Sequence, residues 1–317
     1  MFSGAPMSLS VGANRSWGRR MTQATTSGKS VAGVPSQLFG YEVVEYLGEG
    51  AASHIYAVSD PATRQVYALK HVVCKTAKDQ RFAEQLLNEY EVGRQINNPL
   101  IRRVLDAKVN RNLLRKIIDA ALVMELVDGT PLDQRPNSPL PEILSIFSQV
   151  AKALAAMHSA GFIHCDLKPN NILVCSDGSI KLIDLGQACP ALTIKERIQG
   201  TPDYIAPEQV KREPVTVRTD VFNFGATLYW ALCGKAMPTL FTLKRGDNSF
   251  LLDQAIPTPR DVNPQVPEAL SNLVMDCTRT NPTKRPGSMD DISRRLELIG
   301  LGLTRAQNNG GHQAAAG

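Results

Sequence analysis

Apolar and polar residues alternate in short runs after residue 40, and this pattern predicts an antiparallel sheet. Three runs have the period of two that half-buried strands show, at residues 41–47, 54–59 and 64–73. Gly48-Glu49-Gly50 and Asp60-Pro61-Ala62-Thr63 separate these runs and are typical of strand connections. A nearly continuous apolar run at 117–127 predicts a further, buried strand.

The spacing of apolar residues is helical elsewhere. Residues 79–96 form one helical stretch among the strands, and further helices are predicted at 221–232, 267–279 and 289–298. A core helix is marked by Ile143, Leu144, Phe147, Val150, Ala151, Leu154 and Met157, and Gly161 follows as its stop. The chain therefore reads as an α+β protein, and at 317 residues it could form one large domain or two lobes.

The two ends of the chain differ from the rest in composition. Residues 1–38 are rich in Gly, Ser, Ala and Thr without a sustained period, which predicts a flexible tail. Its arginines and lack of acids also fit a transit peptide, but its glycines and Pro6 disfavour the amphipathic helix that such a peptide needs. Residues 301–317, with Asn-Asn-Gly-Gly and Ala-Ala-Ala, are predicted to be a second flexible tail.

Charge and cysteine content disfavour several function classes. The net charge is +5, but residues 1–40 hold four basic groups and no acids, so the other 277 residues are almost neutral and predict no nucleic-acid partner. No uncharged apolar run reaches about 18 residues, so no membrane span is expected. Six cysteines without a Cys-x-x-Cys pair predict free thiols in a reducing, cytoplasmic compartment.

One stretch gathers the candidate chemistry. Short apolar runs at 172–174 and 180–183, joined by Ser176-Asp177-Gly178-Ser179, predict a β-hairpin. Asp166, Lys168 and Asn171 precede this hairpin and Asp184 follows it. Carboxylate and amide oxygens at its two ends suit Mg²⁺, which takes a few protein ligands and completes its shell with water and substrate phosphates.

These residues carry a family resemblance. His164-Cys165-Asp166-Leu167-Lys168-Pro169-Asn170-Asn171 resembles the catalytic loop of eukaryotic-type protein kinases, and Asp184-Leu185-Gly186 resembles their metal-binding motif. Any one of these acids alone is more often a turn residue or a solvated charge, but their order and spacing favour the kinase interpretation. The resemblance extends over about 41–299 and implies an α+β, two-lobed protein-kinase-like fold. Its small lobe, at 39–127, would be an antiparallel sheet with one helix, and its larger lobe, at 128–300, would be mainly helical.

The sheet lobe contains the features that the resemblance assigns to ATP. Gly48 and Gly50 correspond to the glycine-rich loop over the phosphates, although Ser53 replaces its third glycine. Ile55 replaces the usual valine and, with Ala68, offers apolar contact to the adenine.

Lys70 corresponds to the lysine that holds the α- and β-phosphates and pairs with a helix glutamate. We assign Glu89 to this pair because it shares the packed face of its helix, with Glu91 as the alternative. Gly93, one turn later, stands where the family usually has a bulky residue and could make this helix mobile.

The hinge and the catalytic residues follow from the same resemblance. Met124 would control access to the pocket behind it, and main-chain groups of Glu125 and Val127 would bind the adenine edge. Asp166 would orient the acceptor hydroxyl, and Lys168 would neutralise the transferring phosphoryl group. Asn171 and Asp184 would hold Mg²⁺.

The substrate class is indicated by the segment around the catalytic loop. Lys168, together with Gly200-Thr201-Pro202-Asp203-Tyr204-Ile205-Ala206-Pro207-Glu208, resembles serine/threonine rather than tyrosine kinases. Thr201 would contact Asp166 and Lys168. His164 is interpreted as a structural residue, since the family uses the aspartate.

Two further interpretations concern support and regulation. Glu208 is expected to pair with Arg285, and Asp220 to bind the catalytic-loop backbone. Cys165 replaces the arginine that usually binds a phosphate on the activation loop, and a thiol cannot form that pair. We therefore expect activity that does not depend on phosphorylation between Asp184 and Glu208.

The sequence thus predicts a serine/threonine protein kinase that uses ATP and Mg²⁺ on a protein substrate, with a regulatory partner possible. Two alternatives stay open. A pseudokinase or scaffold is suggested by Ser53 and Gly93 but opposed by the full set of catalytic side chains. A kinase-fold enzyme for a small molecule is opposed by the peptide-platform segment 200–208.

Overall fold

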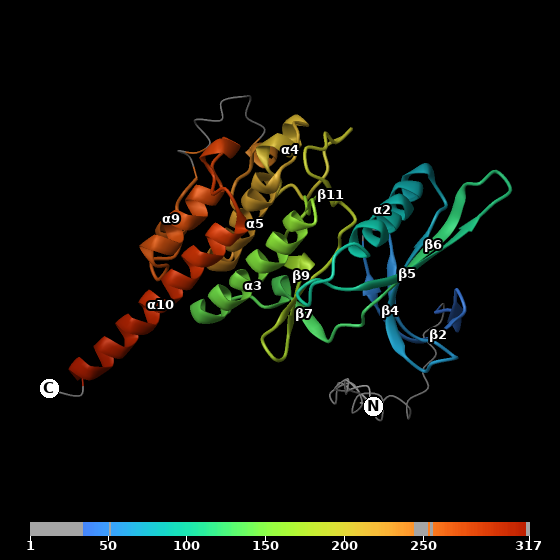
Figure 1. Ribbon diagram of the computed structural model, residues 1–317, viewed down its shortest axis with the longest axis horizontal. Coiled ribbons are helices and arrows are strands. Elements are labelled where there is room, and N and C mark those ends of the chain that lie inside the picture. The colour runs from blue at the N-terminus through green and yellow to red at the C-terminus, as the bar shows by residue number, and fades with distance from the viewer. Residues whose placement is uncertain (1–33, 51, 244–252, 254–255, 315–317) are drawn as a thin grey trace, which may run out of the picture. The chain divides into compact units, whose positions relative to one another are not determined.

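The computed structural model describes residues 34–50, 52–243, 253 and 256–314 (Figure 1). The predicted N-terminal tail lies almost entirely outside these residues. A six-stranded antiparallel sheet has the order β1-β2-β3-β4-β6-β5. Its strands are β1 (Gln37–Leu38), β2 (Tyr41–Glu49), β3 (His54–Ser59), β4 (Val66–Val73), β5 (Val104–Arg111) and β6 (Ile117–Met124).

The three strands predicted from alternation are present, and the apolar run at 117–127 contains the buried strand β6, as expected. Two strands were not predicted. β1 is only two residues long, and β5, with the sequence VLDAKVNR, lies at the sheet edge, where its polar side chains reach solvent.

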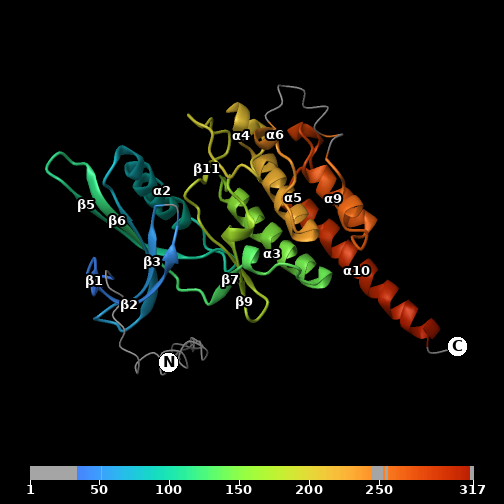
Figure 2. The same ribbon diagram turned by 180° about the vertical axis from the view of Figure 1, so that it is seen from behind.

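Helix α2 (Ala77–Gly93) packs against β4, β5 and β6, as Figures 1 and 2 show. It begins at a capping box, in which Thr76 accepts from the Asp79 N–H and the Asp79 carboxylate accepts from the Thr76 N–H. Its buried face includes Leu86, Glu89 and Val92. The predicted helical face is therefore confirmed, and Glu89 lies on it.

The second lobe is mainly helical. Its longer helices are α3 (Leu140–Ser159), α5 (Val217–Cys233), α9 (Glu268–Cys277) and α10 (Met289–Ala314), and its short helices are α4 (Pro207–Lys211), α6 (Leu240–Leu243) and α8 (Pro259–Val262). Short strands and 3₁₀ turns carry the loops: β7 (Gly129–Pro131), η1 (Leu132–Gln134), β8 (Phe162–Ile163), η2 (Pro169–Asn171), β9 (Ile172–Cys175), β10 (Ile180–Leu182), β11 (Cys189–Pro190) and η3 (Pro282–Lys284).

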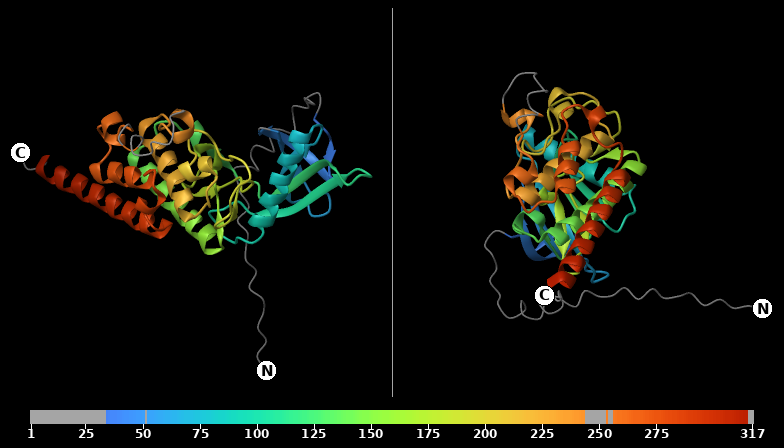
Figure 3. Two further views of the ribbon diagram at one scale, coloured as in Figure 1. Left: turned by 90° about the horizontal axis from the view of Figure 1, so that it is seen from above. Right: turned by 90° about the vertical axis from the view of Figure 1, so that its left-hand side faces the viewer.

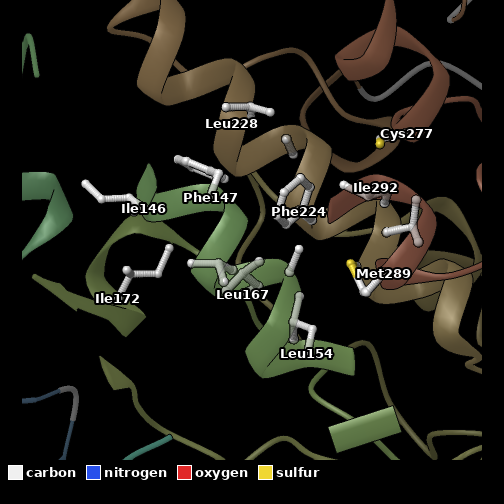
Figure 4. Packing of buried hydrophobic residues seen from close by; sticks show 14 of the residues in the cluster. Ile146, Phe147, Leu154, Leu167, Ile172, Phe224, Leu228, Cys277, Met289 and Ile292 are labelled. Atoms are coloured by element: carbon white, nitrogen blue, oxygen red, sulfur yellow. The ribbon is translucent and has the colours of Figure 1, made fainter. Parts of the chain in front are cut away.

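The core of this lobe forms between α3 and α5. Phe147 and Phe224 meet edge to face with ring centroids 5.4 Å apart, and Leu154 and Leu167 lie close by (Figure 4). By length and composition alone, α3 could cross a bilayer. Half of its apolar stretch is buried inside the protein, however, and the core helices of soluble proteins have the same length and composition. It therefore gives only weak evidence for a membrane span.

The structure corrects the prediction for the C-terminal end. α10 continues to Ala314, whereas the sequence predicted a helix end near Leu298 and a flexible tail from 301. Ile299 and Leu303 still pack on the core, and a helix that has already formed adds one hydrogen bond for each residue that it fixes. Figure 3 shows the last turns of α10 projecting beyond the other helices.

Candidate active site

Lys70 of β4 forms ion pairs with two carboxylates. Its Nζ lies 2.7 Å from Glu89 Oε2 and 3.4 Å from Asp184 Oδ1. Burial lowers the pKa of Lys70, but the carboxylates of Asp184 and Glu89 raise it by more, so the ammonium is held charged. Glu91 is exposed and lies 3.4 Å from Arg94, so Glu89 is the partner and the alternative is wrong.

Arg102 adds a second cation to Glu89, which the sequence analysis did not identify. Its Nη2 lies 3.4 Å from Glu89 Oε1, and its main-chain N–H donates to the Leu182 carbonyl at 3.0 Å. The Glu89 side chain is only 2% exposed, so a buried carboxylate needs both partners. No sequence signal separates Arg102 from its neighbour Arg103, because the selection depends on how the segment 100–102, just before β5, pairs with Leu182 of β10.

Asp184 follows the β9–β10 hairpin in a left-handed conformation, with φ of 64°. The pKa of the Asp184 carboxyl is lowered to about 2, mainly by Lys70, and Lys168 and His164 act in the same direction. Burial raises this pKa but is outweighed. Asp184 is therefore ionised at neutral pH, which a magnesium ligand requires.

Asp166, Lys168 and Thr201 form one hydrogen-bonded group. Lys168 Nζ donates to Asp166 Oδ2 at 3.1 Å and to Thr201 Oγ1 at 3.0 Å, while Thr201 donates to Asp166 Oδ1 at 2.8 Å. The contacts predicted for Thr201 are thus present. Asp166 is 8% exposed, so its carboxylate is fixed in direction yet still reaches the surface.

Asn171 completes the oxygen-rich end of the hairpin. Its Nδ2 donates to the Asp166 carbonyl at 2.9 Å, so the amide oxygen faces away from that bond. Its main-chain carbonyl accepts from the Ile183 N–H at 2.9 Å, which brings Asn171 next to Asp184. Two oxygen ligands fit Mg²⁺, because this ion takes its other ligands from water and phosphates. Within the described residues, no group of three or more His, Cys, Asp or Glu side chains is arranged to hold a metal ion.

Asp220 binds the main chain of the catalytic loop, as predicted. Its two oxygens accept from the N–H groups of His164 at 2.8 Å and Cys165 at 2.9 Å. Cys165 has φ of 66°, a left-handed conformation that a side chain rarely adopts, and these bonds hold it there. His164 is fully buried, in agreement with a structural role.

Glu208 and Arg285 form the predicted ion pair. Arg285 binds both carboxylate oxygens, with Nη1 2.7 Å from Oε1 and Nη2 2.9 Å from Oε2. The pair is buried and fixes the segment 200–208 against the helices.

The glycine-rich loop is closed by one short bond. Gly50 N–H donates to the Ser53 carbonyl at 2.7 Å, and a Cβ at Gly50 would lie 2.9 Å from Ser53 Oγ. Gly48 has φ of +148°, which favours glycine. Ser53 thus occupies space inside the loop. Residue 51 lies outside the described residues.

The predicted adenine-binding residues come together at the junction of β3, β4 and β6. Ala68 pairs with Met124 in the sheet, and Ile55 packs beside them in the same apolar cluster. The Glu125 N–H donates to the Arg103 carbonyl at 2.9 Å. The main-chain group of Glu125 that can still hydrogen-bond an adenine is therefore its carbonyl, as an acceptor. Val127 follows in the connection to β7.

Asn88 is the other contact that sequence reasoning missed. Its Nδ2 lies 2.9 Å from the Ala188 carbonyl, 3.2 Å from that of Gly186 and 3.4 Å from that of Leu185. It thus ties α2 to the segment after Asp184.

Comparison with known proteins supports the same interpretation. Residues 41–295 match the model of the protein kinase domain. The chain is 30% identical over 296 residues to the serine/threonine-protein kinase PknL of Mycobacterium tuberculosis, covering 87% of this chain and 71% of PknL. It is 31% identical over 285 residues to the serine/threonine-protein kinase PkaA of Streptomyces coelicolor, covering 83% and 50%.

Some relatives are much longer than this chain. A probable serine/threonine-protein kinase of Clostridium acetobutylicum is 29% identical over 272 residues, which is 82% of this chain but 40% of that protein. Among solved structures, the kinase domain of Mycobacterium tuberculosis PknI, crystallised as a double mutant, superposes with a TM-score of 0.67 at 25% identity, covering 84% of this chain and 99% of that one.

Proposed function

Because the chain belongs to the serine/threonine protein kinase family, we propose that it transfers the γ-phosphoryl group of ATP to serine or threonine hydroxyls of a protein. The observation that carries this proposal is the group formed by Asp166, Lys168 and Thr201, which combines a base, a cation and a hydroxyl at hydrogen-bond distances.

The side chains divide the work of positioning and charge stabilisation. Asp166 accepts and orients the acceptor hydroxyl, while Lys168 places positive charge beside the transferring group. Lys70, held by Glu89, contacts the α- and β-phosphates. Asn171 and Asp184 would hold Mg²⁺, which would neutralise further phosphate charge. The transition state needs little covalent help, so this electrostatic arrangement is the main contribution of the protein.

Thr201 supports the choice of a serine or threonine acceptor. Its hydroxyl bridges Asp166 and Lys168, so the position of Thr201 at the acceptor site is fixed by two hydrogen bonds. The segment 200–208 is anchored by the buried Glu208–Arg285 pair and can bear an extended peptide.

We further propose that activity does not require phosphate between Asp184 and Glu208. This segment is already fastened by unmodified groups. Lys195 Nζ donates to the Gln187 carbonyl at 2.7 Å, and Arg212 Nη1 donates to the Glu196 carbonyl at 3.1 Å. The Thr193 carbonyl accepts from the Val215 N–H at 3.0 Å. With Cys165 in place of an arginine, no phosphate partner is expected beside Asp166.

The predicted cytoplasmic location and a regulatory partner stay proposals. All six cysteines are free thiols, which favours a reducing compartment. A partner that acts on α2 is one possible regulator, since α2 carries Glu89.

A comparison of acceptors tests the function. The chain is incubated with labelled Mg·ATP and a generic protein, a peptide mixture, or amino alcohols and sugars, and the phosphorylated amino acids are identified. We expect label on serine and threonine of protein only. Label on a small molecule, or on tyrosine, would overturn the proposal. Enzyme treated with phosphatase should keep its rate, and recovery only after phosphorylation at Thr193 or Thr201 would refute phosphate independence.

A further inference from the structure

The side chains of Cys165 and Cys189 contact each other through their sulfur atoms, and Cys165 immediately precedes Asp166 of the candidate active site. Their Sγ atoms are 3.7 Å apart. Cys165 follows β8, Cys189 belongs to β11, and these two strands pair with Cys189 opposite Ile163. The sulfurs thus join the catalytic loop to the segment that follows Asp184.

The surroundings of the pair are apolar on one side and polar on the other. Ile163 and Val215 belong to the same buried apolar cluster as both cysteines. Cys165 is 1% exposed and Cys189 is 7% exposed, so only Cys189 has a path to solvent. Lys195 and Thr193 lie on that side.

The two thiols differ in acidity. The hydrogen bond from Cys165 lowers the pKa of Cys189 to about 6, with burial opposing and the Lys195 ammonium assisting. The same bond and burial raise the pKa of Cys165. Cys189 is therefore the thiolate, which is the reactive form, and Cys165 is the neutral neighbour that can resolve an oxidised partner.

We propose that Cys165 and Cys189 are an oxidation site at which hydrogen peroxide produces a reversible disulfide that lowers phosphoryl transfer. The Cys189 thiolate attacks one peroxide oxygen, the O–O bond breaks, and Cys189 becomes a sulfenic acid while hydroxide leaves. Cys165 Sγ then attacks Cys189 Sγ and loses its proton, the S–O bond breaks, and hydroxide leaves as water. The two thiols lose two electrons in total, and the peroxide is reduced to two waters.

The disulfide would act on Asp166 through the backbone. The sulfurs must close from 3.7 Å to about 2.05 Å. The main chain of Cys165 is fixed, with its N–H on Asp220 at 2.9 Å and its carbonyl accepting from Gln209 Nε2 at 2.7 Å. Strain at this point is passed to the adjacent Asp166, and a shift of about 1 Å in a reacting group can cost about 100-fold in rate.

The experiment uses the full chain, reduced and then freed of reductant, and treated with hydrogen peroxide. Non-reducing peptide mapping and intact mass give one readout, and protein phosphorylation rate gives the other. We expect a Cys165–Cys189 linked peptide, a loss of two hydrogen atoms in mass, and a fall in rate of about 10-fold or more that dithiothreitol reverses.

Matched variants separate the site from general oxidation. Cys189→Ser and Cys165→Ala should each abolish the linked peptide and the peroxide sensitivity, while Cys175→Ser, at the half-buried end of β9, should keep both. Thermal unfolding checks that each variant is folded. The proposal would be overturned if the treated wild type formed no linked Cys165–Cys189 peptide. It would also be overturned if the linked peptide formed but the protein phosphorylation rate stayed unchanged. The rate effect rests on the proposed kinase activity, but the peptide is detected even if that activity fails.

Discussion

The side-chain amide of Asn88 donates to the main-chain carbonyl of Ala188 at 2.9 Å. Asn88 immediately precedes Glu89, so two adjacent residues of α2 bind the two halves of the site. Glu89 fixes Lys70, and Asn88 fixes the chain just after Asp184. The position of α2 therefore affects both Lys70, which we propose contacts the phosphates, and the segment of Asp184, which we propose holds the metal.

Removing this contact should reduce activity more than stability. A single hydrogen bond contributes about 0.5–1.5 kcal/mol, so Asn88→Ala should lower kcat by about two- to tenfold. Steady-state kinetics with a protein acceptor measure the change. Gln95→Ala, which removes an exposed bond to the Glu91 carbonyl, is the matched control and should leave kcat unaltered. An Asn88→Ala enzyme with normal kcat would show that α2 does not position the segment.

The Glu208–Arg285 pair should contribute strongly to folding. Arg285→Ala leaves a buried carboxylate without its partner, and the expected loss of unfolding free energy is about 3–5 kcal/mol. Arg285→Lys keeps the charge but cannot bind both oxygens, so an intermediate loss is expected. Denaturant titration measures both. Arg294→Ala, which breaks an exposed pair with Asp291, should change stability by less than about 0.5 kcal/mol. Equal losses for the two alanine variants would contradict this account.

Asp220 should make stability depend on pH. Burial raises the pKa of its carboxyl, but His158 and the His164 N–H lower it by more, and the net pKa lies below its ordinary value of 3.8. A group with a depressed folded pKa stabilises the fold above its unfolded pKa, and that contribution is lost as pH falls through its folded pKa. Asp220→Asn should therefore be clearly less stable than wild type at neutral pH.

The difference between wild type and Asp220→Asn should narrow as pH is lowered below about 3.8, because this carboxyl takes up a proton in the unfolded chain before it does so in the folded protein. Chemical denaturation at a series of pH values measures it, and Asp290→Asn on the surface controls for the loss of one charge. A difference that grows toward acid pH would show that the sign of the shift is wrong.

Gly93 should tolerate no side chain. A Cβ there would lie 2.8 Å from Val104 Cγ2 and 3.0 Å from Val104 Cγ1, so β5 occupies the space. Gly93→Ala gains about 1 kcal/mol in helix propensity, but overpacking costs about 1–3 kcal/mol, and a net loss of stability is expected. Gly93→Ala combined with Val104→Ala should recover part of that loss. Stabilisation by Gly93→Ala alone would contradict the close packing.

The mobility expected of α2 at Gly93 stays a prediction, but the structure shows which residue lies beside this glycine. The bulk that the family places at this helix position is supplied here by Val104, which packs against the glycine from β5. A missing side chain in one segment was visible in the sequence, whereas its replacement by a residue from another strand was not.

The catalytic loop was predictable because its residues are close in sequence and each type has one favoured role. Asp166, Lys168, Asn171 and Asp184 all fall within one hairpin and its flanks, and Glu89 followed from the helical face. Asn88, Arg102 and the Cys165–Cys189 contact depend on segments that meet only after folding. Asn88 and Ala188 are 100 positions apart, and neither carries a motif. The extension of α10 was missed because its glycines suggested an end, whereas Leu303 still packs against the apolar core after folding.

The most direct measurement is the rate of phosphate transfer from labelled Mg·ATP to a protein acceptor by wild type and Asp166→Asn, with ATP binding measured in parallel. A positioned base contributes about 10²- to 10⁴-fold. We predict that Asp166→Asn loses rate in this range while ATP affinity is retained, because Lys70 and Glu89 remain in place. A wild type that binds ATP without transferring phosphate, or an Asp166→Asn enzyme with wild-type rate, would contradict the account.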